Sequence, residues 1–284
     1  MFKKATDVFL FGSIFISFCA VALCIETNLL LHLPLNHFSF YLLVFGATLL
    51  QYNMHYYFKT KSVTNFQRLT WTLKNKNLHI VLVAFGAWLI TFCLLSFPHH
   101  HVFTLMILGV IAFLYSFPFL PFTNKKRIKD FGLLKIITLA LFWTFVTVWF
   151  PLEKANYSEL SFQLIFLSRF IFIFIICLLF DIRDNDIDNK ENIATLSVKL
   201  GVKNAYLLCY FFLILFTTLT IIQFIFFKDY PQLLAMLISG VATIITIEYS
   251  KIHNSDIVYL ACIDGLMLLQ AGLVIFASLI YKGQ

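Results

Sequence analysis

Apolar segments long enough to cross a lipid bilayer recur along the whole chain of 284 residues. A helix that spans the hydrocarbon core of a bilayer needs about 20 predominantly apolar residues. Nine segments meet this requirement, at residues 8–25, 38–57, 78–97, 102–119, 134–150, 162–180, 204–227, 231–248 and 257–281. Only 12% of the residues are charged, whereas a soluble globular domain has about 25%. The sequence therefore predicts an all-α integral membrane protein with nine transmembrane helices, in a single polytopic domain over residues 1–284.

The basic residues are concentrated in loops on one side of this predicted bundle. If the N-terminus is cytoplasmic, the longest polar stretches all lie on the cytoplasmic side, at residues 58–77, 120–133 and 181–203. The loops on the opposite side carry only Lys154, Lys228 and Lys282. Because cytoplasmic loops are enriched in Lys and Arg, we expect a cytoplasmic N-terminus and a C-terminus on the opposite side, in the inner membrane if the source is bacterial. Topology thus explains the net charge of +7, and no nucleic-acid partner is expected.

An acidic cluster directly follows the sixth predicted span, in the sequence DIRDNDID at residues 181–188. If the helix continues past the membrane edge, Asp181, Asp184 and Asp188 share one face, and Asp186 lies roughly 140° away from Asp181. Three carboxylates on one face repel one another, so we expect a cation to neutralise them, and oxygen ligands beside a polar loop suit Mg²⁺. The spacing equally allows a solvated helix end, with the carboxylates paired to the basic neighbours Arg183 and Lys190.

The residues after the cluster narrow this choice. The stretch DIRDNDIDNKENIATLSVKLG, residues 181–201, resembles the second aspartate-rich motif of the UbiA superfamily of intramembrane prenyltransferases. That motif runs N/D-x-x-D-x-x-x-D, then a short basic stretch, then T-L-x-V-x-L-G. Asp184 and Asp188 match the DxxxD pair and Asp181 the preceding polar position, whereas Asn192 stands where the family usually has Gly. The tail is matched by Thr195, Leu196, Val198, Leu200 and Gly201.

Further features along the chain agree with the resemblance. Nine helices with the N-terminus inside are the arrangement of the family, and DGLMLLQAG at residues 264–272 looks like its last span. YSFPF, at residues 115–119, resembles the Tyr-Ser/Thr-x-Pro sequence that ends the fourth span. The family often has a lysine four residues after this tyrosine, but here the position holds Phe119, so the charge must come from Lys125, Lys126 or Arg127. The resemblance covers essentially the whole chain and implies a helical bundle around a central cavity that opens near the cytoplasmic face.

The first aspartate motif of the family, N-D-x-x-D-x-x-x-D, is missing. The corresponding stretch is NMHYYFKTK, residues 53–61, in which Asn53 is retained but the three Asp positions hold Met54, Tyr57 and Lys61. Arg68 stands where the family commonly has the Arg of an Asn-Arg-Pro segment, which supports this register. The resemblance therefore implies one Mg²⁺ site instead of two, formed by the carboxylates of the second motif.

Loss of this motif shifts part of the expected chemistry to basic side chains. In the family, metals hold the diphosphate of an isoprenyl donor, and an allylic carbocation then alkylates an acceptor. Departure of the diphosphate needs its developing negative charge neutralised. Lys61, on the same helical face as Asn53 and Tyr57, either supplies the charge of the missing ion or merely follows the positive-inside bias. The candidate contacts of the donor are Asn53, Arg68, Tyr115, Lys125 and Lys126.

Three functions remain open from the sequence. The resemblance favours an enzyme, a transferase of alkyl or aryl groups other than methyl, which moves an isoprenyl group from its diphosphate to a lipophilic or aromatic acceptor in the lipid membrane. Its catalytic residues would be Asp181, Asp184, Asp188 and Lys61. Loss of the first motif favours instead a member without catalysis that binds a polyprenyl lipid or scaffolds a membrane pathway. The third class is a transporter, for which Asp264 inside the ninth predicted span is the residue of interest.

Overall fold

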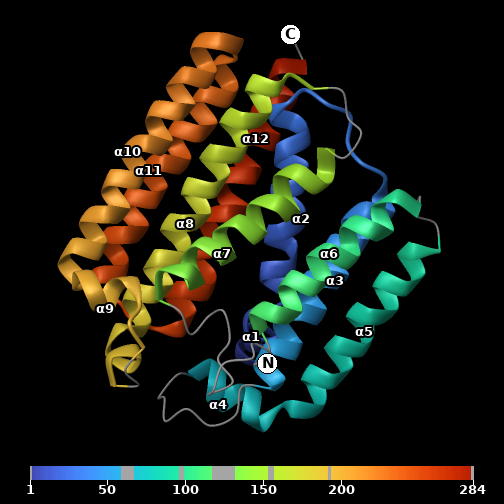
Figure 1. Cartoon of the computed structure of the whole chain (residues 1–284), viewed down its shortest axis with the longest axis vertical. Helices are drawn as coiled ribbons and strands as arrows, with labels where there is room; N and C mark the ends of the chain where they lie inside the picture. The colour runs from blue at the N-terminus through green and yellow to red at the C-terminus, as the bar shows by residue number, and fades with distance from the viewer. Residues whose placement is uncertain are drawn as a thin grey trace.

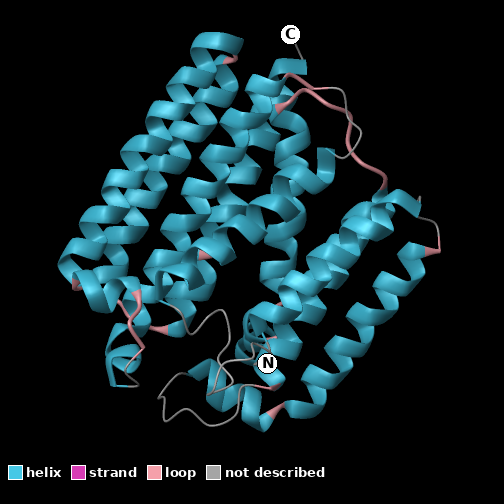
Figure 2. Cartoon of the chain, in the orientation of Figure 1, coloured by secondary structure: helices cyan, strands magenta, loops and turns pink. Residues whose placement is uncertain are grey.

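The computed structural model describes residues 2–58, 67–95, 99–116, 132–152, 157–190 and 193–282. Within these ranges the chain is helical with short connections and contains no strand (Figure 2). The first half of the bundle consists of α1 (Phe2–Phe11), α2 (Ile14–Leu30), α3 (Phe38–Tyr57), α4 (Gln67–Lys74), α5 (Lys76–Leu94) and α6 (His99–Ser116). The second half consists of α7 (Gly132–Thr144), η2 (Phe145–Trp149), η3 (Phe150–Leu152), α8 (Glu159–Lys190), α9 (Leu196–Leu200), α10 (Val202–Phe227), α11 (Tyr230–Ile252), η4 (Val258–Ile263) and α12 (Gly265–Lys282).

Each of the nine predicted spans overlaps a helix, and the chain is an integral membrane protein. Among the described residues, six helices are long and apolar enough to cross a membrane, at Lys76–Leu94, Leu133–Leu152, Glu159–Lys190, Val202–Phe227, Tyr230–Ile252 and Val258–Ile280. Helices α1 and α2 together make a seventh candidate, bent by 53° at the break between them. Ser13 at this break has a φ of 64°, in the left-handed region, which ends the regular α-helical path. The count of nine spans and the cytoplasmic N-terminus stay predictions.

Helix α8 forms the centre of the bundle. It is 32 residues long, and most of the side chains of its apolar run are buried. Figure 1 shows α10 and α11 on one side of it and α3, α5 and α6 on the other. The helix continues without a break to Lys190, so Asp181, Asp184 and Asp188 occupy its last turns, as the sequence predicted.

Two glycines allow α3 and α5 to pack closely. A Cβ atom added at Gly46 would lie 2.9 Å from Leu89 Cβ, and one added at Gly86 would lie 2.8 Å from the Gly46 carbonyl oxygen. Real Cβ atoms do not tolerate such distances, so both positions need glycine for this approach. Small residues are common at contacts between membrane helices because lipid offers no hydrophobic driving force, and close backbone packing takes its place.

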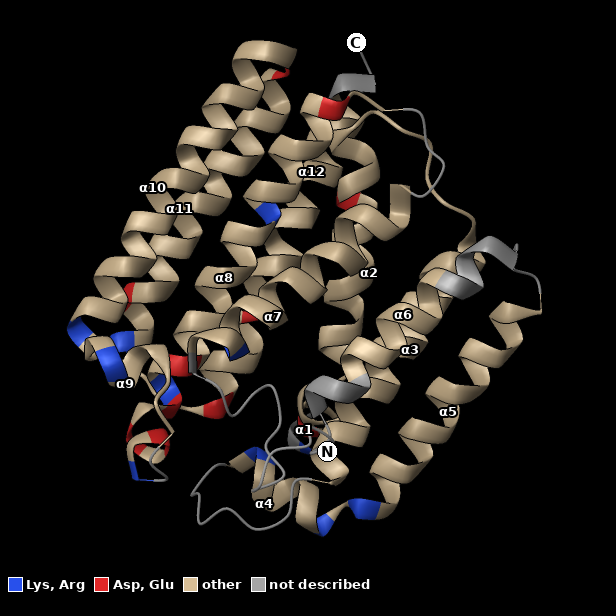
Figure 3. Cartoon of the chain, in the orientation of Figure 1, with Lys and Arg blue, Asp and Glu red and all other residues tan. Residues whose placement is uncertain are grey.

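Most of the charged residues lie toward one end of the bundle, around α4, α9 and the last turns of α8 (Figure 3). An exception lies within the apolar part, where Arg169 Nη2 of α8 is 3.1 Å from Glu26 Oε2 of α2. Both residues are buried, with 3% and 0% of their surface exposed. Ionisable groups inside a membrane are costly and pair with one another, so this contact ties α2 to α8.

Candidate functional site

A cavity of about 890 Å³ lies within the bundle. Apolar and aromatic side chains form most of its wall, and the rings include those of Tyr52, Tyr56, Phe142, Trp143, Phe150 and Phe180. Its charged lining residues are Arg68, Lys135, Asp181, Arg183, Asp184, Asp188 and Asp264. Apart from Asp264, these residues belong to the first turns of α4 and α7 and to the last turns of α8. The cavity is therefore an apolar chamber with one charged end.

Asp181 is fully engaged with other parts of the chain. Only 1% of its surface is exposed. Its Oδ2 accepts a hydrogen bond from the backbone N–H of Ser197 at 3.0 Å, and its backbone oxygen accepts one from Ser197 Oγ at 2.9 Å. A carboxylate near the N-terminus of a helix such as α9 is electrostatically favourable. Asp181 thus fastens the segment after the acidic cluster to α8.

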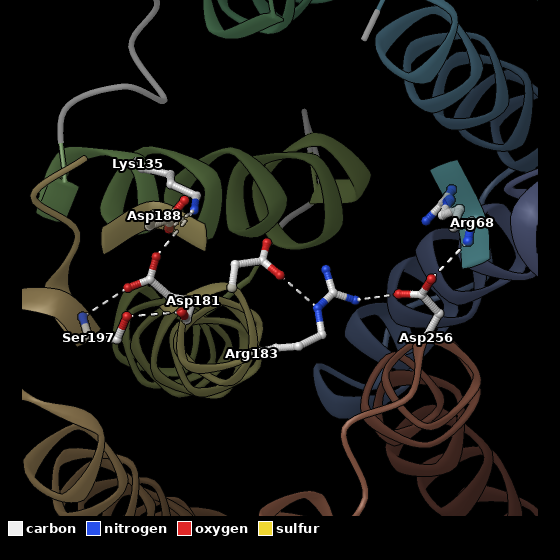
Figure 4. A network of polar contacts seen from close by, with 8 residues as sticks. Arg68, Lys135, Asp181, Arg183, Asp188, Ser197 and Asp256 are labelled. Carbon is white, nitrogen blue, oxygen red and sulfur yellow. Dashed lines mark hydrogen bonds and ion pairs between the residues drawn. The ribbon is translucent and has the colours of Figure 1, made fainter. Parts of the chain in front are cut away.

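Lys135 neutralises two of the clustered carboxylates. Its Nζ lies 3.2 Å from Asp181 Oδ1 and 3.7 Å from Asp188 Oδ2, and its side chain is 25% exposed. Figure 4 shows the lysine reaching from α7 to both aspartates. An ammonium group from a neighbouring helix thus compensates part of the charge of the acidic face.

Asp184 and Asp256 bind Arg183 from opposite sides. Arg183 Nε lies 2.8 Å from Asp184 Oδ1, and Arg183 Nη1 lies 3.3 Å from Asp256 Oδ1. The other oxygen of Asp256 accepts a hydrogen bond from the backbone N–H of Arg68 at 2.8 Å (Figure 4). This chain of contacts connects the acidic cluster on α8 with α4. The alternative of a solvated helix end predicted that Arg183 would pair with a neighbouring carboxylate, and its contact with Asp184 is such a pair.

The guanidinium group of Arg68 is also held in place. Arg68 Nη2 donates a hydrogen bond to Ser13 Oγ at 2.9 Å, and the guanidinium carbon lies 3.7 Å from the centre of the Tyr56 ring. Such a cation–π contact contributes about 0.5–2 kcal/mol. Arg68 is 6% exposed and lines the cavity. The structure therefore brings Arg68 to the same cavity as the acidic cluster.

Asn53, unlike Arg68, lies away from the cavity wall. It is fully buried and does not line the cavity. Its Nδ2 donates hydrogen bonds to the backbone oxygens of Gly12 at 2.9 Å and Leu49 at 2.8 Å, and its Oδ1 lies 2.7 Å from His79 Nδ1. Asn53 thus connects α3 with α5 and with the bend between α1 and α2.

Four of the predicted site residues lie beyond what the structure describes in full. Lys61, Lys125 and Lys126 fall outside the described residues, and of Tyr115 only the helical backbone in α6 is described. Their roles stay predictions.

Sequence reasoning did not single out Lys135, Asp256 or Ser197. A lysine at the start of an apolar run was the available signal for Lys135, because an ionisable residue in a membrane segment is by default a candidate functional residue. Asp256 and Ser197 gave no such signal, since each lies in a polar connection and its partner is distant in the sequence.

The carboxylates fit a metal ion only in a limited way. Among the described side chains, no group of three or more His, Cys, Asp or Glu residues is arranged to hold a metal ion. Asp184 and Asp188 both line the cavity one helical turn apart. Mg²⁺ is usually held by one or two carboxylates and completes its shell with substrate phosphates and water. The pair therefore fits Mg²⁺ bound together with a phosphate ligand, and Asp181 fits a supporting role.

No family model and no curated protein matches the sequence. Solved structures do match in fold. A UbiA homologue from Aeropyrum pernix K1 without ligand gives a TM-score of 0.64 at 13% identity, over 94% of this chain and 98% of that one. A UbiA homologue from Archaeoglobus fulgidus bound to GPP and Mg²⁺ gives 0.62 at 12% identity, over 95% and 98%. A digeranylgeranylglyceryl phosphate synthase gives 0.59 at 15% identity, over 99% and 98%. The chain therefore has the fold of UbiA homologues over nearly its whole length, as the sequence resemblance implied.

Proposed function

We propose that this protein is a prenyltransferase of the UbiA superfamily, which transfers an isoprenyl group from its diphosphate to a lipophilic or aromatic acceptor. The cavity carries the proposal, because it joins an apolar, aromatic chamber to a charged end. An isoprenyl diphosphate has the same division into an apolar chain and a charged group. A homologue of the same fold was solved with GPP and Mg²⁺ bound, which supports a donor of this class.

The basic residues of the cavity are proposed to bind the diphosphate. Arg68, Lys135 and Arg183 all line it. An arginine can donate two parallel hydrogen bonds to a phosphate, and a lysine acts as a point charge. We propose that further positive charge comes from the loops, where the candidates are Lys61, Lys125 and Lys126, and that Tyr115 contributes a hydroxyl group.

A single Mg²⁺ is proposed at Asp184 and Asp188. When bound, the ion would neutralise charge that develops on the departing diphosphate. Asp181 holds the Lys135 ammonium beside this pair, which reduces the repulsion among the three carboxylates. Asn53 does not reach the cavity, so we propose that it acts by fixing α3 and the bend near Ser13, which in turn positions Arg68.

The aromatic chamber suits the reactive part of the donor. Trp143 Nε1 donates a hydrogen bond to the Tyr52 hydroxyl group at 3.3 Å, which orients both rings on the wall. The face of an aromatic ring attracts a cation, so rings held in this way can stabilise an allylic carbocation. The apolar wall also keeps bulk water from the cation.

The alternative is a protein that binds a polyprenyl lipid without turnover. The observation that favours it is the pairing of the acidic cluster, because Lys135 contacts Asp181 and Asp188 while Arg183 contacts Asp184. A chain that supplies its own cations has less need of a catalytic metal.

Diphosphate release from geranyl, farnesyl and geranylgeranyl diphosphate, by protein purified in detergent with Mg²⁺, tests the proposal. We expect release by the wild type and a fall of about 100-fold or more with Asp184→Asn, the range seen when one charge-stabilising group is removed. Asp186→Asn is the matched control, because Asp186 is exposed and does not line the cavity. Equal release by the wild type and Asp184→Asn would overturn the proposal. Binding of a non-hydrolysable thio analogue without any release of diphosphate from the natural donors would favour the alternative.

A further inference from the structure

Asp264 is a buried carboxylate that lines the cavity from a different span than the acidic cluster of α8. It follows η4 and directly precedes α12, inside the candidate span Val258–Ile280. Leu260, Asp264 and Met267 all line the cavity from this span. The chain therefore presents one acidic group on an otherwise apolar strip of the wall.

The carboxylate of Asp264 has no hydrogen-bonded or ion-paired partner in the described part of the chain. Only 8% of the residue is exposed. Its backbone groups are engaged, since its N–H donates to Tyr259 O at 3.0 Å and its carbonyl oxygen lies 3.6 Å from Cys19 Sγ. The charged groups that act on the carboxylate from other elements are Arg68 and Arg183, and neither makes a direct contact with it.

This arrangement is costly without a ligand. An ionisable side chain inside a membrane span is costly and usually marks a functional site, and buried polar side chains are normally hydrogen-bonded. The helix is also irregular here, because η4 is a π-helical turn that inserts one extra residue just before Asp264. Such π-turns occur frequently at functional sites. A ligand group that completes the hydrogen bonding of Asp264 would account for both features.

The surroundings restrict the chemistry of this ligand. A metal ion is disfavoured, because the described side chains around Asp264 form no ligating group of three or more members. The wall beside it, with Tyr52 and Trp143, suits a lipophilic body. A carboxylate on such a wall accepts a hydrogen bond. The ligand that fits is therefore a lipophilic molecule with a hydroxyl group.

We propose that Asp264 binds the hydroxyl group of a lipophilic alcohol or phenol, the acceptor of the transfer, and takes its proton. This inference rests on the proposed function. As the acceptor oxygen forms a bond to C1 of the isoprenyl group, the bond from C1 to the diphosphate oxygen breaks and its electron pair leaves with the diphosphate. The acceptor proton passes to the Asp264 carboxylate, which later returns it to water. The products are an ether and diphosphate.

A pair of probe molecules tests the binding role without any donor. 4-Hexylphenol has a hydroxyl group, and 4-hexylanisole is its methyl ether and cannot donate a hydrogen bond. A hydrogen bond to a charged group contributes about 1.5–3 kcal/mol, so the wild type is expected to bind the phenol about ten-fold more tightly or better. The readouts are tryptophan fluorescence, to which Trp143 on the cavity wall contributes, and thermal stabilisation. Asp264→Leu should remove this preference, and Asp186→Asn should keep it.

The catalytic role is tested with Asp264→Asn, whose side-chain oxygen still accepts a hydrogen bond but takes no proton. Phenol binding and binding of a non-hydrolysable donor analogue should be retained, whereas ether formation should fall by about 100-fold or more, the usual contribution of a general base. Full transfer by Asp264→Asn, or equal binding of phenol and anisole by the wild type, overturns the inference. If the wild type forms no ether from any donor but still prefers the phenol, the prenyltransferase proposal fails while the hydroxyl site stands.

Discussion

Lys135 Nζ lies 3.2 Å from Asp181 Oδ1 and 3.7 Å from Asp188 Oδ2, so one ammonium group on α7 bridges two carboxylates two turns apart on α8. Only 1% and 8% of the surfaces of the two aspartates are exposed, and this lysine compensates part of their charge. The same contact places a cation on the wall of the cavity, where a diphosphate is proposed to bind. Lys135 therefore links the stability of the fold to ligand binding.

Replacing Lys135 with Gln should destabilise the protein, because it removes a cation that contacts two buried carboxylates. Loss of one partner of a buried pair costs about 3–5 kcal/mol, and the lower end is expected since the lysine side chain is 25% exposed. Thermal unfolding in detergent measures the effect. Lys199→Gln is the control, because Lys199 is exposed and forms no ion pair with another described residue. Adding Asp181→Asn to Lys135→Gln should recover part of the loss, and an unchanged unfolding temperature in the single variant would contradict the bridging role.

Replacing Asp256 with Ala should weaken donor binding although Asp256 is not part of the cavity wall. Asp256 holds Arg183 Nη1 and the backbone N–H of Arg68, so its loss frees two proposed diphosphate contacts to move. Affinity for a thio analogue of geranyl diphosphate should fall about ten-fold, the effect of one hydrogen bond to a charged group. Affinity for 4-hexylphenol should fall much less, since Arg68 and Arg183 act on Asp264 without a direct contact. A parallel loss of both affinities would show a general loss of structure and not a positioning role.

The sequence predicted the helices and the acidic face because both follow from local patterns. A helix overlaps every apolar run that was predicted to be a span. The +3 and +4 spacing places Asp181, Asp184 and Asp188 on one face because α8 continues to Lys190. The bridge from Lys135 to Asp181 depends instead on how α7 packs against α8, which no local pattern encodes.

The predictions for the residues of the lost first motif also depended on helix packing, which local patterns do not encode. Arg68 reaches the cavity, whereas Asn53 binds backbone oxygens beside the bend at Ser13. A motif position gives a residue's place on its helix, but the direction in which that helix face points is set by tertiary packing. The bend between α1 and α2 supplies one partner of each residue, and no apolar periodicity reveals it.

Replacing Arg169 with Leu should destabilise the bundle strongly, because Glu26 would remain buried without a partner. The two residues form an ion pair at 3.1 Å between α2 and α8, and breaking a buried pair costs about 3–5 kcal/mol. The double variant Glu26→Leu with Arg169→Leu should regain most of the stability, since well-packed apolar residues often replace a buried pair without loss. Thermal unfolding of the three proteins measures this. Lys251→Gln serves as the contrast, because its pair with Glu248 is exposed and should matter little.

Removing divalent cations should weaken donor binding without abolishing it. The proposed site has one Mg²⁺ at Asp184 and Asp188, while Arg68, Lys135 and Arg183 remain as cations of the chain on the same cavity. With EDTA, the affinity for the thio analogue should fall about ten-fold, as expected for the loss of one strong charged contact, whereas diphosphate release should stop. In Lys135→Gln, binding should depend on Mg²⁺ much more steeply, because the ion then has to compensate the carboxylates as well as the diphosphate. Titration calorimetry with and without EDTA measures both affinities. Binding that EDTA leaves unchanged in the wild type would contradict the metal site, and binding that it abolishes would contradict the role of the three basic residues.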